Sequence, residues 1–139
     1  MAYDKTNIFA RILRGELPAF KVYEDEASLA FLDIMPQAKG HTLVVPKAGA
    51  EGLLDIPPDA LAGAMLTTQK VAAAVKRAVE APGFMIAQLN GPAAGQTVFH
   101  IHFHIIPRWE GADFKLHARE KAPEAELKDI QAKIVAALG

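Results

Sequence analysis

Residues 98–106 read Val-Phe-His-Ile-His-Phe-His-Ile-Ile, with histidine at every second position from 100 to 104. Side chains of a β-strand point alternately to its two faces, so the pattern predicts a strand with His100, His102 and His104 on one face. The large apolar side chains at 99, 101, 103 and 105 share the other face, which we expect to pack on the core. Packing alone gives no reason to place three histidines in a row.

Three kinds of site are compatible with these histidines. Structural histidines would each need a hydrogen-bond partner when buried, because an unsatisfied imidazole costs about 1–3 kcal/mol. A metal would use two neighbours, since His100 and His104 are about 13 Å apart along a strand and zinc–nitrogen bonds are about 2.0–2.1 Å. The chain has no cysteine and no second ligand pair such as His-x-x-x-His. Nucleophilic and acid–base chemistry is the third kind, because the ordinary imidazole pKa is about 6.5.

The segment before the histidines has the composition of a ligand-binding loop. Residues 90–97 read Asn-Gly-Pro-Ala-Ala-Gly-Gln-Thr and follow an apolar run at 84–89. Glycine and proline indicate a turn between two strands. Asn90, Gln96 and Thr97 supply amide and hydroxyl donors, and glycine exposes backbone N–H groups, which together suit a phosphate. Turns of this composition also join hairpins that bind nothing.

Residues 95–106, from Gly-Gln-Thr-Val through the alternating histidines, resemble the signature of the histidine triad (HIT) family. The resemblance extends to Asn-Ile-Phe at 7–9, Gly-Glu-Leu-Pro at 15–18 and Val-Tyr-Glu-Asp-Glu at 22–26. It continues through 30–37 and 40–47 and covers roughly residues 3 to 114. These stretches are similar to small bacterial members of the family.

The resemblance implies an enzyme that acts at the α-phosphate of a nucleotide. Members are nucleotide-binding hydrolases or transferases, which here implies hydrolysis of nucleoside phosphoramidates or dinucleoside polyphosphates. His102 matches the nucleophile that forms a covalent nucleotidyl-histidine intermediate. His100 and His104 match the flanking members of the triad, and His41 matches a fourth, upstream histidine. The alternative is a purine-nucleotide-binding regulatory protein with only residual hydrolysis.

The resemblance also implies the residues that hold the nucleotide, which we expect to be a purine nucleotide. Asp33 matches the carboxylate that accepts hydrogen bonds from the ribose hydroxyls, although an Asp at the end of a strand also serves as a turn or helix cap. Phosphate contacts correspond to Asn90, Gln96 and Thr97. Apolar contacts to the base are expected from Phe9, Ile12, Phe31 and Ile34.

One departure from the family concerns zinc. Many bacterial members hold a structural zinc through a Cys-x-x-Cys pair, a later histidine and the first triad histidine. Asn7, Ala10 and Gly49 occupy the positions of the two cysteines and the later histidine. We therefore expect no metal and no other cofactor, which leaves His100 available to support His102.

Composition predicts one soluble domain over residues 1–139. The hydrophobic fraction of 51% is ample for a core, and the net charge of −1 gives no electrostatic footprint for nucleic acid or an anionic membrane. No apolar stretch approaches the roughly 20 residues of a transmembrane helix. Residues 1–5 lack a signal-peptide pattern, so the expected location is the cytoplasm. The family resemblance and an apolar strand at 83–87 lead us to expect a homodimer.

The expected fold is α+β and HIT-like, an antiparallel sheet of about five strands with one long helix and a C-terminal helix. Helices are expected at 6–14, 58–81 and 124–138 from capping signals and the i, i+3, i+4 apolar rhythm. Strands are expected at 21–24, 29–33, 42–45, 84–89 and 98–107. Arg108, Trp109 and Phe114 either cover the sheet or border the leaving-group side of the site, and His117 is expected on the surface.

Overall fold

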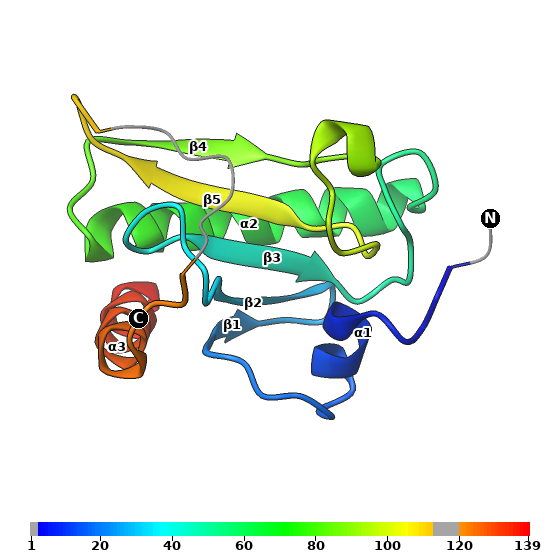
Figure 1. Cartoon of the computed structure of the whole chain (residues 1–139), viewed down its shortest axis with the longest axis horizontal. Coiled ribbons are helices and arrows are strands. Elements are labelled where there is room, and N and C mark those ends of the chain that lie inside the picture. The colour runs from blue at the N-terminus through cyan, green and yellow to red at the C-terminus, as the bar shows by residue number, and fades with distance from the viewer. Residues whose placement is uncertain (1–2, 113–119) are drawn as a thin grey trace.

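A five-stranded antiparallel sheet forms the centre of the computed structural model, which describes residues 3–112 and 120–139 (Figure 1). The spatial order is β1-β2-β3-β5-β4, and all four neighbouring pairs are antiparallel. The strands are β1 (Lys21–Glu24), β2 (Ser28–Leu32), β3 (Thr42–Pro46), β4 (Gly83–Ala87) and β5 (Phe103–Arg108). The helices are α1 (Ile8–Leu13), α2 (Pro58–Ala78), a short 3-10 helix η1 (Pro92–Ala94) and α3 (Glu124–Leu138). The expected fold class is confirmed.

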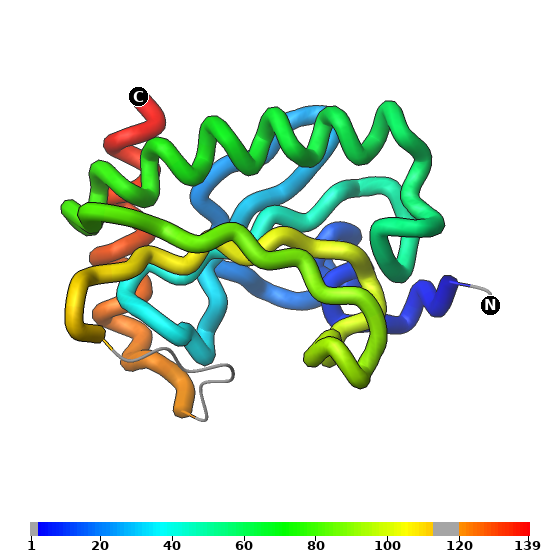
Figure 2. Tube along the Cα trace, turned by 90° about the horizontal axis from the view of Figure 1, so that it is seen from above, coloured from blue at the N-terminus to red at the C-terminus, as the bar shows by residue number. Residues whose placement is uncertain are grey.

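The two faces of the sheet have separate cores. Helix α2 runs along one side of the sheet (Figure 2), and α3 packs against α2 and β1. Ala30 and Leu32 of β2 face this larger core, which contains Val71 and Val75 of α2. The alternating residues Leu29 and Phe31 face a smaller core on the opposite side, where α1 contributes Phe9 and Ile12. Both faces are covered, which explains why every residue of β2 is buried despite the period of two.

Helix α1 is short, and local signals fix both of its ends. The Asn7 side chain accepts a hydrogen bond from the backbone N–H of Ala10 at 2.9 Å, which caps the first turn. Gly15 follows the last turn with a φ of +78°, a conformation that glycine adopts without steric cost. Of the two N-cap candidates that the sequence offers, Thr6 and Asn7, the structure uses Asn7, and this start places Phe9 and Ile12 against the sheet.

The strand predicted at 98–107 is corrected, because β5 begins only at Phe103. His100 donates through Nε2 to the Pro46 carbonyl at 2.7 Å, and the backbone N–H of Ile101 donates to the Ala50 carbonyl at 2.8 Å. These bonds hold residues 100 and 101 against the last residue of β3 and the loop that follows it, in place of the regular hydrogen bonds between strands. Phe99, expected on the core face, is therefore 37% exposed.

The remaining boundaries differ from the predicted ones by only a few residues. Helix α2 ends at Ala78, and Glu80 just beyond it has a φ of +53°. Strand β2 ends at Leu32, so Asp33 lies immediately after it. Within residues 3–112 and 120–139, no helix is both long and apolar enough to span a bilayer. Phe114 and His117 lie outside the described residues.

Candidate active site

A cavity of about 500 Å³ lies on the α1 side of the sheet. Its lining comes from α1 and the segment after it, from β2 and the loop that follows, from Leu43 of β3, from the loop before β5, and from β5 itself. Most of the lining is apolar, and its polar side chains are Asp33, Gln37, Thr97, His102 and His104. Eight of the residues predicted from the sequence line it: Phe9, Ile12, Phe31, Asp33, Ile34, Thr97, His102 and His104. The other four, His41, Asn90, Gln96 and His100, are not part of the lining.

His102 has a single hydrogen-bonding arrangement when its ring is neutral. Its Nδ1 lies 2.7 Å from the backbone carbonyl oxygen of His100, which can only accept, so Nδ1 carries the hydrogen and Nε2 has the lone pair. Burial lowers the pKa of His102, partly offset by this same hydrogen bond. The ring of Phe9 packs edge-on against it, with ring centroids 4.8 Å apart. His102 is therefore a neutral, oriented nucleophile candidate.

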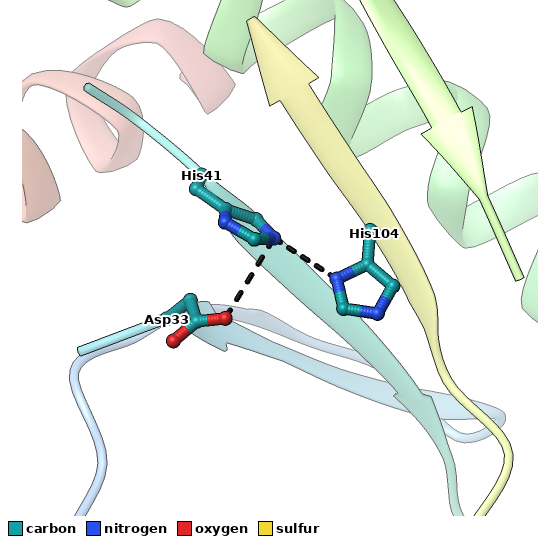
Figure 3. Close-up of side chains that lie close together, drawn as sticks. All are labelled: Asp33, His41 and His104. Atoms are coloured by element: carbon teal, nitrogen blue, oxygen red, sulfur yellow. Dashed lines mark hydrogen bonds and ion pairs between the residues drawn. The ribbon is translucent and has the colours of Figure 1, made fainter. Parts of the chain in front are cut away.

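His41 is hydrogen-bonded to His104, which lines the cavity, while His41 does not (Figure 3). The backbone N–H of Gln37 donates to Nδ1 of His41 at 3.1 Å, so the hydrogen of the neutral His41 ring is on Nε2. His41 Nε2 donates to His104 Nδ1 at 3.0 Å. Burial, followed by the nearby rings of His104 and His102, lowers the pKa of His41 to about 3. The hydrogen of His104 is consequently on Nε2, which points away from His41.

Asp33 caps a turn and also lines the cavity. Its Oδ1 accepts a hydrogen bond from the backbone N–H of Met35 at 2.9 Å, which is the turn-capping role. Its Oδ2 lies 3.7 Å from Nε2 of His41, and the residue lines the cavity. Burial raises the pKa of the Asp33 carboxyl, while the Met35 hydrogen bond lowers it. Because His41 is neutral, the contact between them joins a carboxyl group to an imidazole N–H.

Asp33, His41 and His104 bring three potential metal-ligand atoms within 4.8 Å of one another. A metal-bound histidine must offer a lone pair. In His41 the nitrogen that faces the other two residues carries the hydrogen, because the Gln37 N–H occupies the lone pair of the other nitrogen. The donor set thus fits a hydrogen-bonded relay and does not fit a metal ion. The expectation that the protein holds no metal stays a prediction.

Gln96 and Asn90 tie two loops together. Gln96 Nε2 donates to the backbone carbonyls of Glu51 and Val98, at 2.7 and 3.1 Å, and Oε1 accepts from the Gly91 N–H at 2.7 Å. Both amide hydrogens are therefore used within the protein, and the expected contact of this amide with a phosphate stays a prediction. Asn90 Oδ1 accepts from the backbone N–H of Leu53 at 2.8 Å, which links the same two loops. Their role in this structure is to hold the loop that leads to His102.

Sequence reasoning missed Tyr3, whose hydroxyl is hydrogen-bonded to His100 Nδ1. The two residues are 97 positions apart, so no local pattern could have indicated the contact. Trp109, left open from the sequence, is partly buried and packs against the larger core, in line with the sheet-covering interpretation. Arg108 donates to the Ala112 carbonyl at 2.9 Å.

Comparison with known proteins places this arrangement in a family. The sequence model of the HIT domain matches residues 14–111. This chain belongs to the HIT domain family. Among curated relatives, the Protein hit of Bacillus subtilis is 42% identical over 132 residues, which cover 91% of this HIT protein and 90% of the relative.

Two other relatives carry enzyme names. An adenosine 5'-monophosphoramidase of Saccharomyces cerevisiae is 42% identical over 105 residues, covering 76% of this chain and 64% of the relative. An adenylylsulfatase of Arabidopsis thaliana is 36% identical over 124 residues, covering 85% and 63%. The HIT proteins similar to this chain thus include hydrolases of nucleotides.

Solved structures share the fold over nearly the whole chain. A Hit-like protein from Bartonella henselae, described as involved in cell-cycle regulation, has a TM-score of 0.93 at 47% identity and covers 99% of both chains. A histidine triad nucleotide-binding protein from Sulfolobus tokodaii has a TM-score of 0.87 at 36% identity, covering 94% and 91%. A zinc-bound histidine triad protein from Mycobacterium smegmatis has a TM-score of 0.85 at 39% identity, covering 96% and 93%.

Proposed function

We propose that this HIT protein hydrolyses nucleoside phosphoramidates or dinucleoside polyphosphates at the α-phosphorus, with His102 as the nucleophile. One observation carries the proposal: the Nε2 lone pair of His102 is fixed by the bond from Nδ1 to the His100 carbonyl, in a ring that lines the cavity. The enzyme names of the yeast and plant relatives support the same reaction class.

The reaction proceeds in two displacements. His102 Nε2 attacks the α-phosphorus, the bond to the leaving nitrogen or oxygen breaks, and the nucleotide is left on His102. Water then attacks the phosphorus, the bond to His102 Nε2 breaks, and the nucleoside monophosphate leaves. For a phosphoramidate the first step takes up one proton at the leaving nitrogen and the second releases one from water. His104, whose ring centroid is 4.8 Å from that of His102, is proposed to gain a second proton from solvent and to donate it through Nε2 to the leaving nitrogen. The neutral ring then takes up the proton that water releases in the second step.

The nucleoside is proposed to lie in the apolar part of the cavity. Phe9, Ile12, Phe31 and Ile34 supply surface for a planar base, and an apolar wall of this kind favours a purine for its larger contact area. The ribose is proposed to reach Asp33, whose carboxyl group accepts hydrogen bonds from hydroxyls. A nucleotide-binding regulatory role with incidental hydrolysis remains the alternative proposal, and the same cavity supports it.

His102→Asn tests the proposal. The wild-type protein, mixed with excess adenosine 5'-phosphoramidate and quenched rapidly, should give a burst of product and a protein adduct whose mass increases by one adenylyl group. His102→Asn removes the attacking nitrogen, so the adduct should vanish and kcat should fall by several orders of magnitude. Binding of adenosine monophosphate to the variant, measured by calorimetry, should persist. Near-wild-type turnover in His102→Asn would exclude His102 as nucleophile, whereas tight binding with no burst in the wild type would favour the regulatory role.

A further inference from the structure

The ring of Tyr3 occupies a space that only a glycine at position 49 leaves open. A Cβ atom built on Gly49 would lie 2.9 Å from Cε2 of Tyr3, closer than packed carbon atoms approach. The same ring lies edge-on to the ring of His100, with centroids 5.5 Å apart. Tyr3 thus packs between the loop after β3 and the first histidine of the triad.

The hydroxyl of Tyr3 joins two side chains in a chain of hydrogen bonds with a defined direction. His100 Nε2 is 2.7 Å from the Pro46 carbonyl, which can only accept, so the hydrogen of the neutral ring is on Nε2 and Nδ1 accepts. The Tyr3 hydroxyl therefore donates to His100 Nδ1. Asn7 Nδ2 donates in turn to the Tyr3 oxygen at 2.9 Å. Burial lowers the pKa of His100, which agrees with a neutral ring.

The chain of hydrogen bonds continues to His102. The backbone carbonyl of His100 accepts the hydrogen of His102 Nδ1 at 2.7 Å. The N–H of the same peptide, that of Ile101, donates to the Ala50 carbonyl at 2.8 Å. The peptide that selects the His102 tautomer is therefore held through its N–H by the Ala50 carbonyl and through the His100 side chain by Pro46 and Tyr3.

We propose that Tyr3 is a positioning residue for His102. Its hydroxyl fixes the orientation of the His100 ring, and this ring holds the His100 carbonyl where it keeps the hydrogen on Nδ1 of His102 and the lone pair on Nε2. Tyr3 is not among the residues that line the cavity, so it acts on the orientation of His102 and not on nucleotide binding. The kinetic test of this proposal rests on the proposed function. The measurement of the His102 tautomer does not.

Tyr3→Phe is the primary test, because it keeps the ring beside Gly49 and removes the hydroxyl donor. For adenosine 5'-phosphoramidate we expect kcat to fall by about tenfold, the factor equivalent to about 1.4 kcal/mol, with KM unchanged. The ¹⁵N resonances of His102 should show the Nδ1–H tautomer in the wild type and a mixture of tautomers in the variant. Tyr23→Phe is the matched control, since it is the other tyrosine of the chain and its hydroxyl contacts Lys70. The control should match the wild type in both readouts.

Asn7→Asp is a second variant for the same network. Its carboxylate keeps the oxygen that caps α1 but attracts the Tyr3 hydrogen away from His100, so it should reproduce the effect of Tyr3→Phe. An unchanged His102 tautomer in both variants, or a rise in KM at constant kcat, overturns the proposal. Failure of both variants to fold overturns it as well, because the network would then serve folding alone. If the wild type turns over no phosphoramidate, the proposed function fails while the ¹⁵N comparison still decides the role of Tyr3.

Discussion

At the scale of single residues, the chemistry of the site depends on which ring nitrogen of each histidine carries its hydrogen. Backbone groups decide this for His41, His100 and His102, through Gln37 N–H, the Pro46 carbonyl and the His100 carbonyl. The hydrogen of His104 is on Nε2 because its Nδ1 accepts from His41. The sequence alone indicated histidines in a row, but these acceptors and donors come from three separate segments of the chain.

The stability of the folded state should fall in acid because of these neutral histidines. Between pH 6.5 and about 3 the unfolded chain protonates His41 and the folded protein does not, so the free energy of unfolding falls as the pH falls. The slope from one such group is about 1.4 kcal/mol per pH unit. His100 and His102 act in the same direction, whereas the raised pKa of Asp33 acts in the opposite one.

Urea unfolding at several pH values within this window measures the slope. His41→Gln has no titrating ring. The slope of its unfolding free energy against pH should therefore be smaller than that of the wild type by the contribution of about one proton. Identical slopes for the two proteins would mean that His41 titrates normally in the folded state.

Asp33→Asn separates the cap from the ribose contact. The amide oxygen still accepts from Met35 N–H, but the amide nitrogen replaces Oδ2, the oxygen that lies 3.7 Å from His41 Nε2. We expect little change in Tm and a weaker affinity for adenosine monophosphate, by about tenfold for the loss of a good acceptor. The affinity for the 2',3'-dideoxy analogue should change much less, as calorimetry with both ligands would reveal. An equal loss for both nucleotides would point to the cap alone.

At the scale of elements, periodicity and capping signals predicted most of the fold. The bounds of α3, the Asn7 cap of α1 and the order of the strands along the chain follow from local composition. The predicted start of β5 was wrong because the side chain of His100, in the same segment, donates to the Pro46 carbonyl. Alternation in a sequence reports which residues could form a strand, and it does not report when a side chain competes for the backbone of the neighbouring strand.

The loop between β4 and β5 supplies the prediction at this scale. Gln96→Ala would leave the Gly91 N–H and the Glu51 carbonyl without this partner, which should cost about 1–3 kcal/mol and lower Tm by several degrees. The same variant should lower kcat through the disturbed approach to His102. A direct phosphate contact predicts instead a higher KM at unchanged Tm, so thermal unfolding together with steady-state kinetics distinguishes the two roles.

At the scale of the whole molecule, the open edge of the sheet is the surface through which we expect two copies of the chain to associate. Strand β4 is at the edge, and its side chains Phe84 and Ile86 point to the same face with 40% and 38% exposed. Apolar edge strands are prone to pair unless they are covered. The family resemblance and this surface lead to the same expectation of a homodimer.

Light scattering tests the homodimer directly. At micromolar concentration the mass should be about twice 15.0 kDa. Ile86→Glu should shift the protein to the monomer, because the new charge would have to be buried in the interface. Val135→Glu, at an exposed apolar position of α3, is the control and should stay dimeric. A wild-type monomer with full activity would remove the dimer from this account.

The dependence of the histidine rings on backbone partners has a consequence for sequence divergence and for design. Main-chain N–H and C=O groups persist when a side chain is replaced, so substitutions that leave these groups in position can change the shape of the cavity without redistributing the imidazole hydrogens. The backbone conformation of the loops at 33–41 and 46–51 therefore decides which nitrogen of each ring carries the hydrogen. Histidines placed at alternate positions of another five-stranded sheet would lack these backbone partners. Such a design would need the two loops as well as the histidines.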